Sequence, residues 1–303
     1  MRKFISAVKN DFILTAIPVM KFSILIANYN NGKYFKDCYD SLVAQTYTDW
    51  EAIIVDDGST DDSANVISAI IKDDTRFKIF FNETNKGCGF SKRRCVELAE
   101  GDIGGFLDPD DTLIPEALKL MAKAHIDHPE VSLVHSNLFF CDESLQQISV
   151  YNRAKSVTVS DTFLNLDAAV THFASFKVSF YNSNTGIDPD ILRAVDQDLY
   201  LKLSETGPFH FIDKPLYNYR IHNEGISTSK ADHALYWFLK VIMKAEERRS
   251  VNLEDQIADF LNRSDPGNLE INLGNPRYLI LAMIKACKNH PLRFFRKLFL
   301  NKS

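Results

Sequence analysis

The chain has 303 residues, of which 45% are hydrophobic and 25% are charged, and this balance argues against a globally disordered protein. Its formal net charge of −5 argues against a protein that coats nucleic acid, so we expect no nucleic-acid partner. The length is sufficient for one large α/β domain with a smaller appendage.

Cysteine usage and hydropathy point to the reducing interior of a cell. The five cysteines include no CxxC pair, which favours free thiols over a disulfide framework or a zinc site. The N-terminal apolar run is interrupted by Lys9, Asn10 and Asp11 and makes a poor signal peptide. No stretch reaches the roughly 20 apolar residues that a membrane-spanning helix needs. We therefore expect a cytoplasmic protein.

From residue 21 onward, short apolar runs alternate with helical patterns. Strands are predicted at 22–27, 50–55, 77–81, 103–107 and 131–139, and helices at 34–45, 61–71, 91–99 and 115–128. Several of these strands lack polar alternation, as strands buried on both faces do. The alternation predicts a doubly wound, mostly parallel sheet flanked by helices, with ligands beyond the carboxyl ends of the strands.

The second half of the chain is less regular. Residues 141–190 show no clean periodicity, and a helix is predicted at 195–205. Beyond residue 229 only helices are predicted, at 231–249, 253–261 and 276–300. The expected organisation is an N-terminal extension (1–20), an α/β domain (21–228) and a helical C-terminal region (229–303).

A cluster of carboxylates follows the fourth predicted strand, in the run Phe106-Leu107-Asp108-Pro109-Asp110-Asp111. Pro109 favours an extended conformation at Asp108, and side chains two apart in extended chain point the same way. Asp108 and Asp110 can therefore converge on one hard cation such as Mg²⁺ or Mn²⁺. The alternative is that Asp110 or Asp111 caps the helix beginning near Pro115.

Three other strand ends carry polar turns. The first strand ends in Ala27-Asn28-Tyr29-Asn30-Asn31-Gly32, and the second in Val55-Asp56-Asp57-Gly58-Ser59. The third loop, from Asn85 to Arg94, is basic, spaced by glycines and opens a helix, so it can host an anion. Neither a P-loop nor a dinucleotide-binding fingerprint is present.

Together these segments resemble glycosyltransferase family 2, inverting enzymes of the GT-A fold that use nucleotide sugars. The resemblance covers about residues 21–228, through SILIANYNNGKYFKDCYDSLVAQTYTDWEAIIVDDGSTDDS, NKGCG…KRR, AEGDIGGFLDPDD, AVDQDLYLKL and PLYNYRIHNEGIS in this order. Five motifs in the family's order are far more specific than any one of them.

The resemblance implies roles for the strand-end residues in donor binding. Asp57, helped by Asp56, would read the nucleobase or ribose, in a base pocket lined by Ala27, Asn28 and Tyr29.

The acidic turn and the third loop would act on the diphosphate. Asp108 would lie on the ribose side and also reach the metal, which Asp110 would hold. The family often has Ala-Arg-Asn in the third loop, whereas this chain has Lys92-Arg93-Arg94, so the basic contacts are assigned to Lys92 and to Lys86 nearby.

Asp196 is the candidate general base. Val195, Leu199 and Leu203 form the buried stripe of the helix, and Asp196 lies off that stripe in the first turn, where the helix dipole favours a carboxylate. The family's base occupies this position, although Val195 stands where the family often has Glu. Asp198 is the rival base, and helix capping is the alternative role of Asp196.

The segment after residue 215 is expected to close over the donor. The resemblance implies that His222 is a further metal ligand and that Arg220 contacts the diphosphate, within a mobile lid at 218–229 that excludes water. A lone histidine is otherwise most often a packing or surface residue.

The C-terminal tail is basic and amphipathic. After Glu270 it carries no acidic residue, and its basic residues are interleaved with apolar ones at Leu292, Phe294, Phe295, Leu298 and Phe299. Such a helix can lie at the inner face of a membrane and make peripheral contact with anionic lipid. The alternative is a helix packed on the catalytic domain with a solvated basic face.

The expected function is therefore metal-dependent, inverting transfer of a sugar from a nucleoside diphosphate, with UDP as the expected nucleotide. The acceptor would be a hydroxyl of a glycan or lipid-linked glycan in surface polysaccharide synthesis, with Mn²⁺ or Mg²⁺ as cofactor. A nucleotidyltransferase is one alternative, but ANYNNGKYF lacks the glycine-rich signature it needs. A non-catalytic nucleotide-sugar-binding protein is another, and it would be expected to lose the acids that this chain retains.

Overall fold

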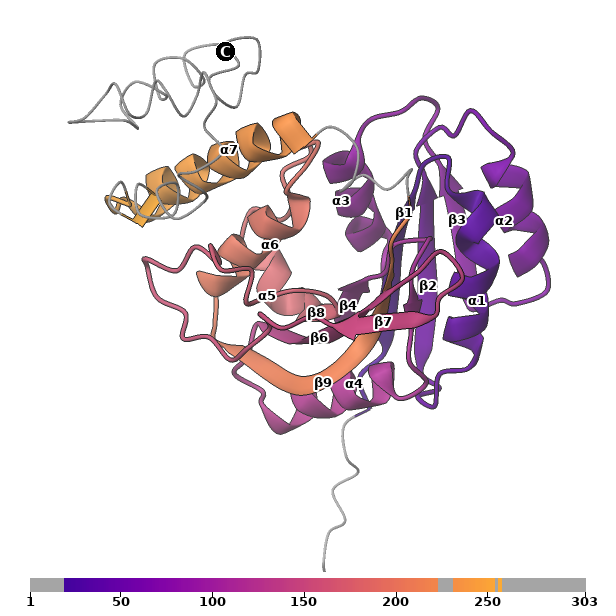
Figure 1. The fold of residues 1–303 in the computed structure, drawn as a ribbon, viewed down its shortest axis with the longest axis horizontal. Helices are drawn as coiled ribbons and strands as arrows, with labels where there is room; N and C mark the ends of the chain where they lie inside the picture. Colours follow the sequence, from indigo (N-terminus) through magenta and orange to yellow (C-terminus); the bar gives the residue numbers. More distant parts are fainter. Residues whose placement is uncertain (1–18, 223–230, 254–255, 258–303) are drawn as a thin grey trace, which may run out of the picture.

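The computed structural model describes residues 19–222, 231–253 and 256–257. Within these ranges one mixed sheet of nine strands is covered by helices (Figure 1). The strands are β1 (Phe22–Asn28), β2 (Trp50–Asp56), β3 (Phe77–Phe81), β4 (Ile103–Phe106), β5 (Thr112–Leu113), β6 (Leu133–Cys141), β7 (Gln147–Val150), β8 (Ala174–Lys177) and β9 (Phe209–Arg220). The helices are α1 (Phe35–Val43), α2 (Ser63–Ile71), α3 (Cys88–Leu98), α4 (Ala117–Asp127), α5 (Val178–Asn182), α6 (Val195–Ser204) and α7 (Ala231–Arg249).

The first half of the sheet is the predicted parallel one. Its strands lie in the order β3-β2-β1-β4, and all three pairings are parallel. In this register Asn28 at the end of β1 lies beside Asp56 at the end of β2. The polar strand ends that the sequence singled out therefore share one edge of the sheet.

The second half departs from a simple parallel series. β8 inserts antiparallel between β4 and β6, and β9 then runs parallel to β6. β8 comes from the stretch at 141–190 that showed no periodicity, because a four-residue strand buried at every position has no alternation to detect. The short strand β5 pairs antiparallel with β9, and β7 pairs with β6 at the edge.

Part of the expected lid belongs to strand β9. The sequence assigned residues 218–229 to a mobile segment, whereas 218–220 belong to β9 and pair with β6. In this pairing Tyr217 lies beside Leu138, Tyr219 beside Phe140 and Arg220 beside Cys141. Arg220 is therefore part of the sheet rather than of a loop. The remaining lid residues after His222 lie outside the described residues.

Two apolar cores fill the two faces of the sheet. Leu25 and Val55 point toward α3, α6 and α7, and Ile24 and Ile54 point toward α1, α2 and α4. This alternation along β1 and β2 follows from the period of two in a strand, and every position of both strands is buried except Ala27, which is partly buried.

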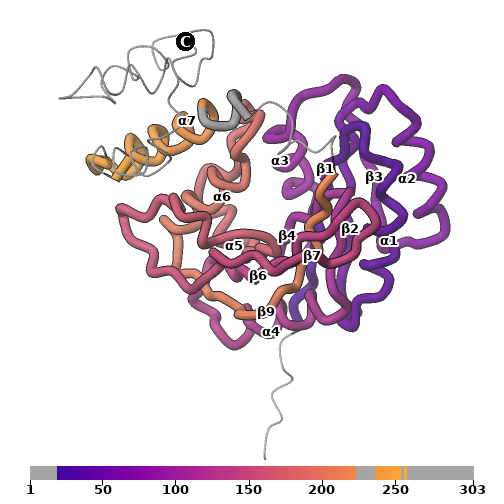
Figure 2. The backbone as a smooth tube through the Cα atoms, viewed as in Figure 1, coloured from indigo at the N-terminus to yellow at the C-terminus, as the bar shows by residue number. Residues whose placement is uncertain are grey.

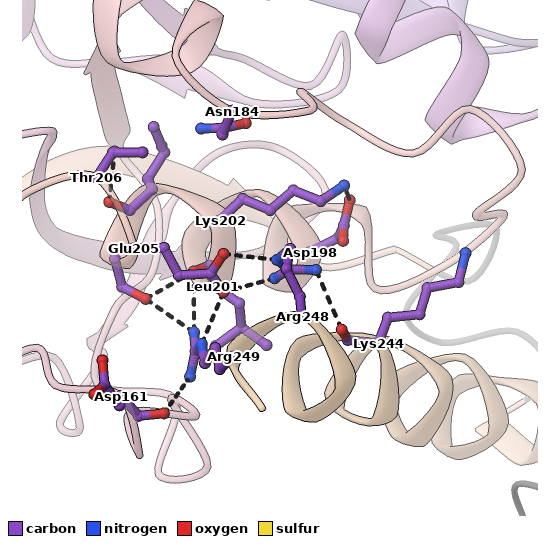
Figure 3. Close-up of polar contacts among 12 residues, drawn as sticks. Asp161, Asn184, Asp198, Leu201, Lys202, Glu205, Thr206, Lys244, Arg248 and Arg249 are labelled. Atoms are coloured by element: carbon purple, nitrogen blue, oxygen red, sulfur yellow. Dashed lines mark hydrogen bonds and ion pairs between the residues drawn. The ribbon is translucent and has the colours of Figure 1, made fainter. Parts of the chain in front are cut away.

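Helix α7 confirms the helix predicted at 231–249 and lies beside α6 (Figure 2). Glu205, just after α6, accepts hydrogen bonds from both Arg248 and Arg249, and Arg249 also donates to the carbonyl of Leu201 (Figure 3). The side chain of Arg249 is only 4% exposed, so these contacts anchor the end of α7.

The structure does not describe most of the residues on which the other C-terminal predictions rest. The predicted helix at 276–300 and most of the one at 253–261 lie outside the described residues, as does the N-terminal extension up to residue 18. Among the residues that the structure describes, no helix is both long and apolar enough to cross a membrane.

Candidate active site

The acidic turn after β4 is held to β9 through Asp111. Asp111 is 2% exposed and accepts hydrogen bonds from the Tyr217 hydroxyl (2.6 Å) and from the backbone N–H of Arg220 (2.7 Å). Burial, together with Asp110 and Asp108, raises the pKa of Asp111 well above its ordinary value. The capping alternative for these acids is wrong, because α4 begins at Ala117 without a side-chain cap.

Asp110 and His222 meet on one side of this turn. Oδ2 of Asp110 lies 2.8 Å from Nε2 of His222, and the imidazole packs on the ring of Tyr34 with 4.7 Å between ring centroids. A carboxylate oxygen and an imidazole nitrogen are both common metal ligands.

These two side chains fit a divalent cation that has two protein ligands. Within the described residues no group of three His, Cys, Asp or Glu side chains converges on a single point. Two ligands are sufficient for an ion of the Mg²⁺ type, since it commonly takes its other ligands from substrate phosphates and water. Asp108, the third predicted ligand, lies instead toward Lys92.

Lys92 lies between two carboxylates that come from distant parts of the chain. Its Nζ is 2.8 Å from Oδ1 of Asp196 and 3.6 Å from Oδ1 of Asp108, and the lysine side chain is 5% exposed. Burial disfavours the charged ammonium, but Asp108 and Asp196 outweigh it and hold the pKa of Lys92 well above its ordinary value. A permanent cation therefore links the acidic turn to the candidate base.

Asp196 has its two oxygens in different surroundings. Oδ1 accepts the hydrogen bond from Lys92, and Oδ2 lies 3.8 Å from Nε2 of His172. Burial raises the pKa of Asp196, but attraction to Lys92 and His172 outweighs it, so the pKa lies below its ordinary value. The carboxylate is ionised near pH 7 and its side chain is 32% exposed, so a hydroxyl can reach it.

Asp198 faces away from this site. It is 1% exposed, pairs with Lys202 at 2.7 Å (Figure 3), and accepts a hydrogen bond from the backbone N–H of Asp188. Lys202 also donates to the carbonyl of Gly186. These contacts fasten the loop before α6 to the helix, which is a structural role.

Asp56 and Asp57 are buried, and their carboxylates accept hydrogen bonds from other residues of the chain. Asp56 accepts bonds from Asn28 (2.7 Å) and from Ser59. Asp57 accepts bonds from the amide of Asn82 and from the backbone N–H groups of Lys86 and Gly87. Both carboxylates therefore order the loops around the predicted base pocket.

Other predicted donor-site residues differ in exposure. Asn28 is buried, and its Oδ1 has no hydrogen-bond partner among the described residues, whereas Tyr29 is 46% exposed and Ala27 is partly buried. The side chain of Lys86 is exposed.

The guanidinium of Arg220 is engaged in hydrogen bonds with other residues of the chain. Its guanidinium donates to the carbonyls of Asp110 and Glu143 and to the carboxylate of Asp37, and it lies over the Tyr34 ring. Contact with a diphosphate, as predicted, would require an exchange of these bonds.

Sequence reasoning missed two residues at the site. His172 lies in the irregular stretch, and Tyr217 lies within the motif PLYNYRIHNEGIS, where it was given no role. The rings of His172 and Tyr217 stack with 5.3 Å between centroids. His172 belongs to no motif and comes to the site just before β8, whereas Tyr217 comes to it within β9.

Comparison with known proteins agrees with this architecture. A model of the family described as Glycosyl transferase family 2 matches residues 23–184, which is more than half of the chain. The chain belongs to this family, as the sequence motifs predicted.

Two curated relatives are named as synthases of chondroitin and hyaluronan. The chain is 33% identical over 244 residues to a chondroitin synthase of Escherichia coli, covering 78% of this chain and 34% of the relative. It is 31% identical over 221 residues to a hyaluronan synthase of Pasteurella multocida, covering 73% of this chain and 22% of the relative. The chain thus spans about a third or less of the length of these relatives.

Solved structures share the fold. The S. aureus TarS 1–349 complex with UDP-GlcNAc has a TM-score of 0.69 at 23% identity, covering 88% of this chain and 80% of that one. A mannosyltransferase from Pyrobaculum calidifontis, solved with GDP-Man and Mn²⁺, has a TM-score of 0.55 at 16% identity, covering 92% and 83%. The predicted GT-A-type fold is thereby confirmed.

Proposed function

We propose that the chain transfers a sugar, with inversion, from a nucleoside diphosphate to a hydroxyl of a glycan or lipid-linked glycan. The observation that supports this most directly is the link from Asp196 through the buried Lys92 to Asp108. It places a carboxylate that is ionised at neutral pH beside the acidic turn at the carboxyl edge of the sheet, where ligands of such sheets bind.

In this proposal Asp196 takes the proton of the acceptor hydroxyl. The acceptor oxygen forms the new bond to the anomeric carbon, and the bond from that carbon to the diphosphate oxygen breaks on the opposite face. The nucleoside diphosphate leaves with the electron pair. The ammonium of Lys92 lies within ion-pair distance of Asp196 and Asp108, so its charge also favours the approach of the anionic donor.

Asp110 and His222 would hold Mn²⁺ or Mg²⁺ in this proposal. A bound ion would neutralise negative charge that develops on the diphosphate. Asp111 and Arg220 hold the turn that presents Asp110, through the hydrogen bond from the Arg220 backbone and the Arg220 guanidinium bond to the Asp110 carbonyl.

Donor recognition is proposed at the ends of β1 and β2, with Asp57 and Asp56 helped by Ala27, Asn28 and Tyr29. The buried Oδ1 of Asn28 is an acceptor that a nucleobase N–H can satisfy. UDP is the proposed nucleotide because a structural neighbour binds UDP-GlcNAc, and the acceptor class follows from relatives named as polysaccharide synthases. Action at the cytoplasmic face of a membrane in surface polysaccharide synthesis fits such an acceptor.

A donor screen tests the proposal. The chain is incubated with UDP-glucose, UDP-N-acetylglucosamine, UDP-N-acetylgalactosamine, UDP-glucuronate and GDP-mannose, each with Mn²⁺ and chondroitin or hyaluronan oligosaccharides. Release of nucleoside diphosphate, and extension of the oligosaccharide by mass spectrometry, are measured. We expect release from a UDP-sugar that requires the acceptor and is lost in Asp196→Asn.

The alternatives give different results in the same screen. A nucleotidyltransferase would release no nucleoside diphosphate in this screen, and it would release pyrophosphate when a nucleoside triphosphate and a sugar phosphate are supplied instead. A non-catalytic binding protein would bind a UDP-sugar in calorimetry and release no UDP. Either result would replace the proposed function.

A further inference from the structure

Among the residues that the structure describes, His172 is the one histidine within ion-pair distance of Asp196, the candidate base. Its Nε2 lies 3.8 Å from Oδ2 of Asp196, and its side chain is 18% exposed, so part of it is open to solvent. The residue precedes β8, which brings it to the sheet beside α6.

The imidazole is held in place by a rigid support. Its ring stacks on Tyr217, which is fully buried in β9. The Tyr217 hydroxyl donates to Asp111 and accepts a hydrogen bond from the backbone N–H of Asp108 at 3.3 Å. The same tyrosine therefore fixes the acidic turn and the orientation of His172.

The two oxygens of Asp196 differ in their capacity to take a proton. Oδ1 already accepts a bond from the ammonium of Lys92. No hydrogen bond from a protein donor to Oδ2 occurs among the described residues, and Oδ2 faces His172 across 3.8 Å. That separation exceeds a direct hydrogen bond and leaves room for one oxygen atom in contact with both groups.

We propose that His172 binds the attacking hydroxyl of the acceptor, so that this hydroxyl lies between Oδ2 of Asp196 and Nε2 of His172. The inference rests on the proposed transferase function. The hydroxyl donates its hydrogen to Asp196, and the Nε2–H of His172 donates to one lone pair of the hydroxyl oxygen. The other lone pair is left for the anomeric carbon.

This arrangement explains why a residue outside every motif is placed beside the base. Loss of the proton to Asp196 converts the hydroxyl into a better nucleophile, and the hydrogen bond from His172 fixes its direction. Orientation of a nucleophile is worth large factors in rate, and misplacement by about 1 Å can cost about 100-fold. His172 thus belongs to acceptor binding, separate from the donor residues at β1 and β2.

Two substitutions separate the hydrogen bond from the packing. His172→Phe keeps an aromatic ring to stack on Tyr217 and loses the donor. His172→Gln keeps an amide donor close to the position of Nε2 and loses the ring. His128→Phe is the matched control, because this histidine also stacks on a ring, that of His210, near the opposite edge of the sheet where β9 begins.

The measurements are UDP affinity by calorimetry, melting temperature, and kcat and KM for the oligosaccharide acceptor at saturating UDP-sugar. We expect His172→Phe to lose about 10- to 100-fold in transfer, with a higher acceptor KM, unchanged UDP affinity and unchanged melting temperature. His172→Gln should retain much more transfer than the Phe variant, and His128→Phe should behave as the parent chain does.

Transfer at the parent rate in His172→Phe would overturn the assignment. Equal loss in the Phe and Gln variants would also overturn it, and lower UDP affinity or melting temperature in both would identify His172 as a packing residue. If the parent chain binds UDP and transfers no sugar in any combination of the screen, the proposed function fails first and this inference falls with it.

Discussion

Lys92 of α3 and Asp196 of α6 form an ion pair, with 2.8 Å between Nζ and Oδ1, although 104 residues separate them in the chain. Lys92 is almost fully buried, whereas Asp196 keeps about a third of its side chain exposed. The lysine keeps Asp196 ionised and at the same time lowers its affinity for a proton. This pair therefore sets the pH range over which Asp196 is unprotonated, as the proposed base must be.

Replacement of Lys92 should move that range. Burial raises the pKa of Asp196 and Lys92 lowers it, so in Lys92→Met the pKa of Asp196 rises. Since the base must be unprotonated, the acidic limb of the kcat profile at saturating donor should shift to higher pH. Profiles between about pH 4.5 and pH 8 measure this shift. Lys119→Met, at an exposed lysine of α4 outside the candidate site, is the control. Superimposable profiles for the Lys92 variant and the parent would contradict the prediction.

Asp196 and Asp198 lie two residues apart and should respond differently to substitution by Asn. Asp196→Asn cannot accept the proton, so transfer should fall on the order of 100-fold or more while UDP affinity persists. Asp198→Asn leaves the buried Lys202 without its counter-charge, and breaking such a pair typically costs about 3–5 kcal/mol of stability. Turnover, UDP affinity and denaturant unfolding are compared for both variants. A well-folded, inactive Asp198→Asn beside an active Asp196→Asn would reverse the assignment.

Binding of UDP should depend on a divalent cation through Asp110 and His222. Calorimetry with Mn²⁺ should give an affinity at least about tenfold above that in EDTA, a difference of roughly 1.4 kcal/mol. Asp110→Asn and His222→Gln should bind UDP weakly and equally in both conditions. Asp127→Asn, which removes an exposed carboxylate paired with Lys123, should retain the difference. Equal UDP affinity of the parent chain with Mn²⁺ and with EDTA would eliminate the metal site.

The buried His135 should make the fold sensitive to acid. Its ring is fully buried, neither ring nitrogen has a hydrogen-bond partner among the described residues, and burial together with His210 lowers its pKa to about 3. The folded pKa lies below the unfolded value of about 6.5, so the neutral ring contributes its full stability above pH 6.5 and loses it as the pH falls toward 3. One such group corresponds to about 1.4 kcal/mol per pH unit within that window.

The substitution His135→Leu should therefore flatten the acid side of the stability profile. Unfolding in urea at pH 7 and at pH 5 should show that the variant loses about 2 kcal/mol less than the parent chain over this interval. His125 contributes a similar slope in both proteins, because burial also lowers its pKa to about 3. His128→Gln, at a partly exposed histidine, is the control, and an equal loss in His135→Leu and the parent would refute the prediction.

Local pattern was sufficient for the parallel half of the sheet. Mainly apolar runs such as 50–55 predict strands buried on both faces, and the intervening helical periodicity predicts the crossovers. Strands that run in one direction bring their carboxyl ends to one edge, so Asn28 and Asp56 were expected together before any coordinates. The family motifs also identified Asp110, His222 and Asp196, whose catalytic roles stay predictions.

The tertiary structure decided which neighbouring acids are buried and what they contact. Asp110 and Asp111 are adjacent and chemically alike, yet one meets His222 and the other is enclosed by β9. Likewise Asp196 accepts a hydrogen bond from Lys92, whereas Asp198 accepts one from Lys202. Helical and strand periods give the direction of a side chain within its own element, whereas the partner it meets depends on how distant elements pack.

The sequence by itself determined the family, the parallel strands and the acids at their ends, because these are encoded in short runs of adjacent residues. Only the tertiary structure placed His172 and Tyr217 beside Asp196 and the acidic turn. His172 arrives just before β8, which inserts between β4 and β6 from the least periodic part of the chain, and Tyr217 arrives in β9, which pairs with β6. Strand order in a sheet is selected by burial and hydrogen bonding summed over the whole domain, so no local pattern contains it.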